Sequence, residues 1–255
     1  VISDVHGFYD EMMSALNEAG FDINNPEHTI ISAGDATDRG DKPKEVLEFL
    51  MDLHRKDRAI LIRGNHEDLM AQAIWRGSFQ SHDVHNGTVE TAKILTGEKS
   101  SLAACFAMKD CKLFWDYYDA TIDYYETDNA VFVHGWIPYK MVPVEGDRYK
   151  SLPELYRPLV SAYDEDWRDG DWEDARWQNG MQMWEKGIRV PGKTVFCGHW
   201  HANFGRAHID KTHPEWPEEG KEAEFDWSPY INEKICAIDA CTALSHKVNC
   251  VVIEE

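Results

Sequence analysis

The sequence has few of the features that mark secreted, membrane-spanning or disulfide-stapled proteins. Its six cysteines are spread along 255 residues, without the dense spacing of a disulfide framework or a C-x-x-C metal clip. We therefore expect reduced, mostly buried thiols. No apolar run approaches the roughly 20 residues that a membrane-spanning helix needs, so we expect no membrane partner.

Basic residues are also scarce. The chain carries 26 Lys and Arg against 46 Asp and Glu, a formal net charge of −20. The mean field therefore repels polyanions, which argues against long nucleic acid as a partner, although a local metal centre can still attract a phosphate. We expect a cytoplasmic protein. Because Val1 already lies inside an apolar run, we also expect a few residues to precede it.

The remaining composition is that of an ordinary globular protein, with 43% hydrophobic and 28% charged residues. The length permits one large domain or two small ones, and we expect a single domain over residues 1–255. Residues 138–192 are acidic, rich in tryptophan and without clean alternation, which indicates an insertion or cap beside the site. Its tryptophans indicate either local core packing or, alternatively, stacking on a substrate.

Several short apolar runs stop abruptly at polar clusters. Five such runs precede the clusters that begin at Ser3, Gly34, Gly64, His134 and Gly198. Amphipathic stretches at about 8–19 and 43–56 separate the first three runs, which predicts strands alternating with helices. In such folds ligands bind outside the carboxyl ends of the strands, so we expect the clusters to converge on one crevice.

The last part of the chain predicts fewer regular elements. The acidic, proline-bearing stretch 208–229 is typical of a surface loop. Residues 235–239 and 248–253 are apolar and β-branched, and we expect them to form two closing strands.

The clusters gather nitrogen and oxygen donors without any thiolate: Asp4, His6, Asp35, Asn65, His134, His199 and His201. A mixed imidazole and carboxylate set suits Mn²⁺, Fe or Zn²⁺ better than Ca²⁺. One aspartate can bridge two such ions, and Asp35 is the natural bridge. Each motif alone is weak, because a single buried histidine is more often a satisfied core group. Five clusters in one order at strand ends are much harder to explain structurally.

These motifs resemble a known family. Asp4-Val5-His6-Gly7, Gly34-Asp35-Ala36-Thr37-Asp38-Arg39-Gly40, Gly64-Asn65-His66-Glu67, His134-Gly135 and Gly198-His199 are similar to the ordered motifs of calcineurin-like metallophosphoesterases, in the phosphoprotein phosphatase branch. That branch includes serine/threonine phosphatases, small phage and bacterial phosphatases, and symmetrical diadenosine tetraphosphatases. The resemblance implies an α/β fold, a β-sandwich flanked by helices in four αββα layers.

The resemblance also implies roles for individual residues. Asp4, His6 and Asp35 would hold a first metal ion, and Asp35, Asn65, His134 and His199 a second. His66 would be the general acid, oriented by Asp38, while Arg39 and Asn65 would bind phosphate oxygens. Two further assignments stay open. His201 is either a ligand, as in the wider superfamily, or not, and Arg176 is either a second phosphate clamp or an ordinary ion pair. Glu67 is expected to be structural.

The chain departs from the family pattern at several points. Trp136 stands where a second glycine is usual, and Ser3 replaces a glycine at the start of the first motif. Trp200 and His201 follow His199 where a small polar residue is usual, and the tail reads Ile238-Asp239-Ala240-Cys241 where the family often has a glycine. The departure in the tail leaves the substrate-side details there open.

The predicted function is hydrolysis of phosphate monoesters by a water molecule that two divalent metal ions activate. Of the candidate ions, we expect Mn²⁺ ahead of Fe or Zn²⁺. The substrate would be a phosphoserine or phosphothreonine protein or a small phosphate ester. Two alternatives remain, a symmetrical diadenosine tetraphosphate hydrolase, which would share the mechanism, and a non-catalytic metal-binding scaffold. His66, Asp38 and Arg39 argue against the scaffold, which needs neither proton donor nor phosphate clamp. The sequence leaves the oligomeric state open.

Overall fold

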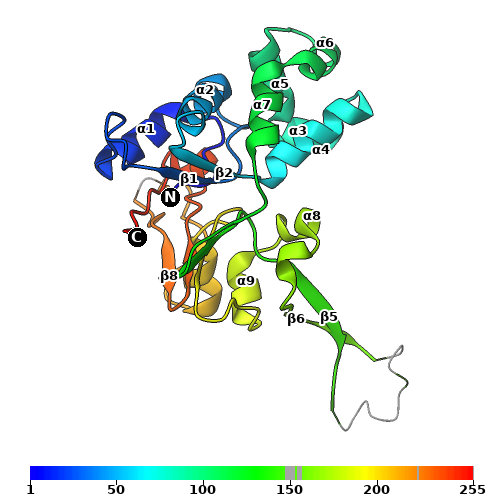
Figure 1. The fold of residues 1–255 in the computed structure, drawn as a ribbon, viewed down its shortest axis with the longest axis vertical. Coiled ribbons are helices and arrows are strands. Elements are labelled where there is room, and N and C mark those ends of the chain that lie inside the picture. The colour runs from blue at the N-terminus through cyan, green and yellow to red at the C-terminus, as the bar shows by residue number, and fades with distance from the viewer. Residues whose placement is uncertain (147–152, 154–156, 223, 255) are drawn as a thin grey trace.

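A computed structural model describes residues 1–146, 153, 157–222 and 224–254. Two stacked sheets form the centre, with helices on both sides, and the two chain ends lie near each other (Figure 1). Within the described residues, no helix is both long and apolar enough to cross a lipid bilayer. All six cysteines are free, as expected, three of them buried and three partly buried.

The first sheet is built on two short parallel strands, β1 (Ile30–Ala33) and β2 (Ala59–Ile62), with Ile30 opposite Ala59. Both are nearly continuous apolar runs and are buried. Three amphipathic helices cover the outer face of this sheet, α1 (Tyr9–Glu18), α2 (Pro43–His54) and α7 (Lys112–Ala120). Pro43 begins α2, where its missing N–H costs no hydrogen bond.

The second sheet has the strand order β3-β4-β7-β9-β8. Its strands are β3 (Tyr125–Glu126), β4 (Ala130–Phe132), β7 (Thr194–Cys197), β8 (Tyr230–Asn232) and β9 (Ile235–Ala237). The central strands β4, β7 and β9 are parallel, and β3 and β8 are antiparallel edges.

The two sheets face each other across a shared apolar core. Ile31 and Ile62 from the first sheet pack with Phe132 and Phe196 from the second, and the two phenylalanine rings stack with centroids 4.8 Å apart. Two short helices, α8 (Trp172–Ala175) and α9 (Gly180–Glu185), cover the other face of the second sheet. The layer order is therefore αββα, as predicted.

A helical region connects the two sheets. It contains α3 (Asn65–Arg76), α4 (Ser81–Asn86), α5 (Thr88–Thr96) and α6 (Ser101–Ala107), then a 3-10 turn at Met108–Asp110. These helices pack on one another around a separate core that includes Met70, Ala92 and Phe114. α3 begins soon after β2 ends. The packing of these helices therefore sets where the side chains in the first turn of α3 point.

The segment 138–192 contains more than helices. It includes a hairpin of β5 (Tyr139–Pro143) and β6 (Leu159–Tyr163), which extends away from the body (Figure 1). A 3-10 turn at Trp167–Asp169 precedes α8. Trp167, Trp172 and Trp184 are buried against the second sheet, which is the local core packing expected for them.

The C-terminal region differs from the prediction. Residues 248–253 do not form a strand, and only an isolated bridge joins Cys250 to Ile2. The backbones of Val1 and Val251 exchange hydrogen bonds beside this bridge, and the Asn249 side chain donates to the carbonyls of Trp227 and Ile238. After Ile238 the chain passes through a short helix, α10 (Thr242–Ser245). The expected loop 208–229 overlaps a π-helical turn at Gly205–Ile209 and has no helix or strand in its remaining described residues.

Candidate metal centre

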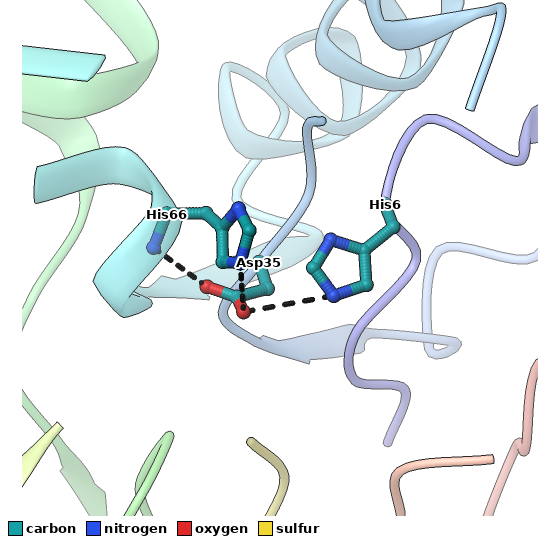
Figure 2. Close-up of side chains that lie close together, drawn as sticks. All are labelled: His6, Asp35 and His66. Carbon is teal, nitrogen blue, oxygen red and sulfur yellow. Dashed lines mark hydrogen bonds and ion pairs between the residues drawn. The ribbon is translucent and has the colours of Figure 1, made fainter. Parts of the chain in front are cut away.

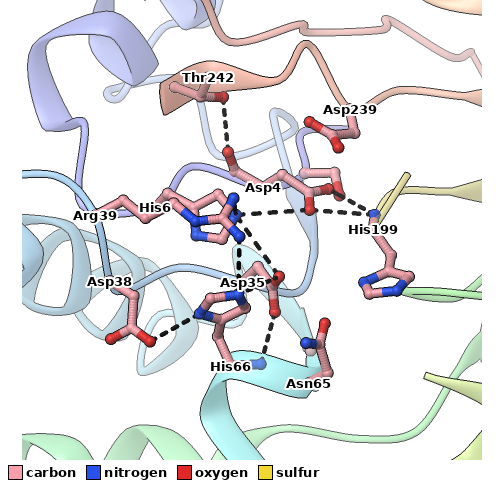
Figure 3. A network of polar contacts seen from close by, with 12 residues as sticks. Asp4, His6, Asp35, Asp38, Arg39, Asn65, His66, His199, Asp239 and Thr242 are labelled. Atoms are coloured by element: carbon pink, nitrogen blue, oxygen red, sulfur yellow. Dashed lines mark hydrogen bonds and ion pairs between the residues drawn. The ribbon is translucent and has the colours of Figure 1, made fainter. Parts of the chain in front are cut away.

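The polar clusters meet at the carboxyl ends of the strands of both sheets. Asp35 follows β1, Asn65 and His66 open α3 directly after β2, and His134 and His199 follow β4 and β7. Figure 3 shows Asp4, His6, Asp35, His66 and His199 directed toward a common centre. The predicted clusters therefore converge on one centre, with contributions from both layers of the sandwich.

The backbone at this centre has an unusual conformation. Six of its non-glycine residues have left-handed φ angles between 51° and 73°: Asp4, His6, Asp35, Asp38, Arg39 and His199. For a residue with a Cβ this region costs free energy, so it persists only where the surroundings enforce it, and such residues cluster at functional sites. The sharp turns place polar side chains at strand ends where a relaxed chain would turn them elsewhere.

Two glycines are required by close approach. A Cβ at Gly64 would lie 2.1 Å from Asp35 Oδ1, and one at Gly198 would lie 2.1 Å from Asp4 Oδ2. Neither distance is compatible with a side chain. The glycines that precede Asn65 and His199 therefore let the main chain pass against the carboxylates of the centre.

Within the described residues, two groups of side chains could each hold a metal ion, and both include Asp35. One consists of His6, Asp35 and His66, and the other of Asp35, His134 and His199. Asp35 Oδ2 lies 3.7 Å from His6 Nε2 and 3.8 Å from His66 Nε2, as Figure 2 shows. Its other oxygen, Oδ1, lies 3.4 Å from His134 Nε2. One carboxylate therefore presents one oxygen to each group.

The histidine tautomers fit a metal pair. His6 Nδ1 lies 3.0 Å from the carbonyl of Thr37, and His134 Nδ1 lies 2.8 Å from the carbonyl of Ala33. A carbonyl only accepts, so each Nδ1 carries the hydrogen and each Nε2 faces the centre. This orientation, with a buried carboxylate between the rings, matches the donor set that divalent transition metals require.

Asp4 and Asn65 lie beside these groups. The Asp4 carboxylate accepts from the Ser3 hydroxyl and from the backbone N–H of His199 at 3.0 Å, while its Oδ1 is 3.9 Å from His6 Nε2. Burial and the nearby Asp35 raise the pKa of Asp4 to about 6. Asn65 Oδ1 lies 2.8 Å from His134 Nε2, at the edge of the second group.

Without metal, the charges at the centre are strongly coupled. Burial alone would lower the pKa of His134, but the Asp35 carboxylate outweighs it and raises that pKa to about 10. Burial raises and the surrounding imidazoles lower the pKa of Asp35, with the net result well below its ordinary value. Burial and His134 lower the pKa of His199 to about 3. His134 is therefore the imidazole whose pKa the Asp35 carboxylate raises most, and it lowers the pKa of Asp35 in return.

His66 is held from behind by a chain of hydrogen bonds. Its Nδ1 lies 2.7 Å from Asp38 Oδ2, and the same oxygen accepts from the Thr88 hydroxyl at 2.7 Å. The Asp38 N–H donates to the Thr91 hydroxyl at 3.0 Å. Burial lowers the pKa of His66, but Asp35 and Asp38 together raise it above its ordinary value. No local motif marks the two threonines, since they lie on α5, about fifty residues beyond Asp38.

Arg39 lies over the first group. One of its guanidinium nitrogens is 3.0 Å from His6 Nε2 and another is 3.3 Å from His66 Nε2. The guanidinium therefore places a positive charge against both imidazoles. The structure thus brings Arg39, His66 and Asp38 together, as the sequence suggested.

Arg176 is in a different setting from the one expected of a phosphate clamp. Its Nε donates to Asp68 Oδ2 at 2.8 Å, and its Nη1 donates to Asp123 Oδ1 at 3.1 Å and to the Trp172 carbonyl at 2.8 Å. The side chain is buried. These contacts link α8 to α3, and a phosphate role for Arg176 remains a prediction.

His201 lies outside both ligand groups. Its Nε2 is 3.3 Å from Glu215 Oε1, and its ring centroid is 4.3 Å from that of Trp216. The side chain is buried, turned from the centre toward the loop that contains Glu215. A ligand role for His201 would require this side chain to move.

Two buried acids near the centre complete the picture. Glu67 accepts from the N–H groups of Gly64, Asp35 and Ala36 at 2.8–3.0 Å, which agrees with a structural role. Asp239 was missed as a site residue. It accepts from the Cys241 N–H at 2.7 Å, and burial together with Asp4 raises its pKa well above the ordinary value. The only signal in the sequence was its position at the end of a predicted strand.

Two departures from the family pattern have local explanations. Ser3 supplies the hydroxyl that donates to Asp4. Trp136 is buried beside α9 and donates from Nε1 to the carbonyl of Ile188 at 3.0 Å, so a core side chain replaces the second glycine. Neither change removes a ligand group.

The chain is similar to two curated hydrolases over part of its length. It is 31% identical over 113 residues to the asymmetrical bis(5'-nucleosyl)-tetraphosphatase PrpE of Bacillus subtilis, covering 42% of this chain and 46% of that protein. It is 31% identical over 139 residues to the symmetrical bis(5'-nucleosyl)-tetraphosphatase of Psychromonas ingrahamii, covering 54% of this chain and 43% of that protein. The chain thus spans less than half the length of either relative.

A solved structure and a family profile extend the match. The cold-active protein-tyrosine phosphatase of a psychrophilic Shewanella species superposes with a TM-score of 0.51 at 15% identity, covering 96% of this chain and 72% of that one. At this identity the likeness shows the fold alone. The profile of the calcineurin-like phosphoesterase family matches residues 1–203, which include every residue of both ligand groups. The chain belongs to the calcineurin-like phosphoesterase family.

Proposed function

We propose that this protein is a metal-dependent phosphoesterase that hydrolyses phosphate monoesters at a pair of divalent ions. The observation that carries the proposal is the Asp35 carboxylate, which lies between two groups of buried imidazoles and faces each with one oxygen. A phosphoserine or phosphothreonine protein, or a small phosphate ester, is the proposed substrate. Mn²⁺ is the proposed ion and the cytoplasm the proposed compartment.

The ligands come from both sheets. His6 and Asp35, with Asp4 beside them, would hold one ion, and Asp35, Asn65, His134 and His199 the other. Two divalent ions held close together neutralise phosphate charge and lower the pKa of a water nucleophile. The chain contributes the fixed positions, since the Thr37 and Ala33 carbonyls orient the two imidazoles before any ion binds.

The remaining polar groups act on the substrate. Asp35 and Asp38 raise the pKa of His66 above its ordinary value, and Asp38 occupies Nδ1, so Nε2 is the ring nitrogen left to donate a proton to the leaving oxygen. Arg39 already contacts both His6 and His66, and its planar guanidinium can exchange these contacts for two phosphate oxygens. A scaffold that only bound metal would need neither arrangement.

A second candidate is hydrolysis of a dinucleoside tetraphosphate. Both curated relatives are named for this activity, one as symmetrical and one as asymmetrical. The same metal pair and the same proton donor would serve an anhydride. Turnover of a phosphoserine peptide compared with that of diadenosine tetraphosphate distinguishes the two candidates.

The test uses Asp35 and an acidic neighbour as a matched pair. Chelated protein should lose turnover of p-nitrophenyl phosphate and regain it with Mn²⁺. Asp35→Asn should bind fewer than two ions per chain and lose most activity, while Asp41→Asn, an exposed change in the same loop region, should keep both. Full turnover in protein shown to be metal-free, or two bound ions with normal turnover in Asp35→Asn, would refute the proposal.

A further inference from the structure

Three large aromatic side chains near the centre are exposed. Trp177, Trp200 and Trp216 have 46%, 38% and 49% of their surface accessible. The rings of Trp177 and Trp200 both contact His199 edge to face, with centroids 5.8 Å and 6.1 Å from the imidazole. Two exposed indoles therefore border a residue of the second ligand group.

Packing within the fold does not account for this exposure. Trp167, Trp172 and Trp184, from the same tryptophan-rich segment as Trp177, are buried against the second sheet. Isolated exposed apolar residues are common, but several large ones gathered beside a polar crevice mark a binding surface. Trp177 and Trp200 provide that arrangement.

The position of both indoles is tied to the centre. The Trp177 ring meets the His199 imidazole edge to face at 5.8 Å. Trp200 follows His199 directly in the chain, and its ring packs edge to face on Phe204 at 6.2 Å. Both rings thus border a residue that would hold a metal, and we expect a ligand seated at that residue to lie close to them.

The aromatic surface continues away from the metals. The Trp200 ring stacks on His201 at 6.4 Å with an interplanar angle of 27°, and His201 lies 4.3 Å from Trp216. The rings of His199, Trp200, His201 and Trp216 thus contact one another in turn. The exposed indoles are flat and uncharged, so they can bind a planar neutral group despite the chain's net charge of −20.

We propose that Trp177 and Trp200 form an aromatic subsite that stacks on the base of a nucleoside phosphate whose phosphate lies at the metal centre. This inference rests on the proposed phosphoesterase function and names its substrate class. In a nucleoside phosphate the sugar separates the base from the phosphate, so the base reaches the residues just outside the ligands. The ring of an aryl ester is attached directly to the scissile oxygen and would stay closer to the metals. Stacking on an aromatic side chain accepts any base, because every base has a π-face.

The experiment compares two ligands that differ only in the base. They are the phosphonate analogues of adenosine 5'-monophosphate and of ribose 5-phosphate, in which a methylene replaces the ester oxygen and prevents hydrolysis. Binding to Mn²⁺-loaded protein is measured by calorimetry. Because base stacking on an aromatic ring is typically worth a factor of about ten or more in affinity, the wild type should prefer the adenosine analogue by roughly that factor.

Variants assign the preference to the two indoles. Trp177→Leu and Trp200→Leu should each reduce the preference several-fold and leave the affinity for the ribose analogue unchanged. Trp177→Phe and Trp200→Phe keep an aromatic face and should retain most of it, which separates stacking from a folding defect. Trp75→Leu is the matched control, because Trp75 is 67% exposed and stacks on Trp115 at the far end of α3. It should behave as the wild type.

Three results would overturn the subsite. They are equal affinity of the wild type for both analogues, an unchanged preference in both leucine variants, and leucine variants that lose turnover of a phosphoserine peptide and keep the base preference. The last would assign the indoles to a peptide. Turnover of p-nitrophenyl phosphate is measured in parallel, and its absence in metal-loaded wild type would refute the phosphoesterase proposal while the binding comparison still decides on the subsite.

Discussion

At the scale of single residues, the proton donor gives the sharpest test. If His66 protonates the leaving oxygen, its loss should matter most for a poor leaving group such as a serine alkoxide. General acid catalysis is typically worth about 10²–10⁴-fold, so His66→Asn should slow phosphoserine turnover by roughly that factor and change an activated aryl phosphate much less. The measurement is the ratio of kcat values on the two substrates.

The control for this prediction is Asp38→Asn. Asp38 only orients and charges His66, through the 2.7 Å contact to Nδ1, so a weaker version of the same dependence on leaving group is expected. Metal content should stay near two ions per chain in both variants. Equal losses on both substrates would instead assign His66 to the phosphoryl oxygens, and loss of metal would make it a ligand, as its place in the first group allows.

Much of the centre could be predicted from the sequence because each ligand follows a strand end. The gathering of Asp35, His134 and His199 needs only that topology. What the sequence could not give is the side-chain setting, which depends on partners far along the chain. Arg176 pairs with Asp68, and His201 with Glu215, contacts that no local motif encodes.

At the scale of elements, Glu126 on β3 ties the second sheet to its surroundings. Its carboxylate binds Arg168 in the 3-10 turn and Lys193 just before β7. The hydrogen bonds from Arg168, then Lys193, lower the pKa of Glu126 to about 2 from an ordinary 4.5. A lowered folded-state pKa means that the stabilisation is fully present above pH 4.5 and is lost as the pH falls toward 2.

Glu126→Gln should therefore destabilise the protein at pH 7 and progressively less below pH 4.5. The pair is partly solvent-screened, so we expect a loss of about 0.2–1 kcal/mol in the free energy of unfolding at neutral pH. Urea denaturation at pH 7 and at pH 3.5 measures the difference. Glu233→Gln, at a 69% exposed side chain, is the control and should show less pH dependence. An effect of Glu126→Gln that is independent of pH would contradict the assignment.

The elements themselves were predicted where the pattern is strong. The strands β2 and β7 begin and end where their apolar runs do, and both N-terminal helices are confirmed within two residues at each end. The strand predicted over 248–253 was wrong, because an apolar run does not reveal how many residues find a backbone partner, and here the pairing is limited to the bridge between Cys250 and Ile2. The β5–β6 hairpin was not predicted, since none of its described strand residues is fully buried and its strands show no alternation of buried and exposed side chains.

At the scale of the whole molecule, we expect bound metal ions to stabilise the folded two-sheet sandwich. Asp4 and Asp35 are buried at the junction of the two sheets, and without ions His134 is the largest opposing charge for both carboxylates. A ligand at 100 times its Kd stabilises by about 2.7 kcal/mol. At roughly 2–4 °C per kcal/mol for a chain of this size, chelation should lower the Tm by about 5–10 °C.

Thermal unfolding with and without chelator checks this expectation. Restoring Mn²⁺ should restore the Tm. In Asp35→Asn the shift on chelation should be smaller, because one acid shared by both ligand groups is missing. An unchanged Tm in wild-type protein shown to have lost its ions would mean that the centre contributes nothing to stability.

The left-handed turns at the centre have a consequence for sequence change over time. Asp, Asn and His enter this backbone region more readily than most residues, and they are also the residues that carry metal donors on short side chains. Asp4, His6, Asp35 and His199 satisfy both demands at once. Asp35→Glu keeps the negative charge but changes two other properties. The longer side chain moves the carboxylate away from its position between the ligand groups, and glutamate adopts a left-handed backbone conformation less readily than aspartate. We therefore expect few amino-acid substitutions at this centre to preserve both the metal donors and the fold.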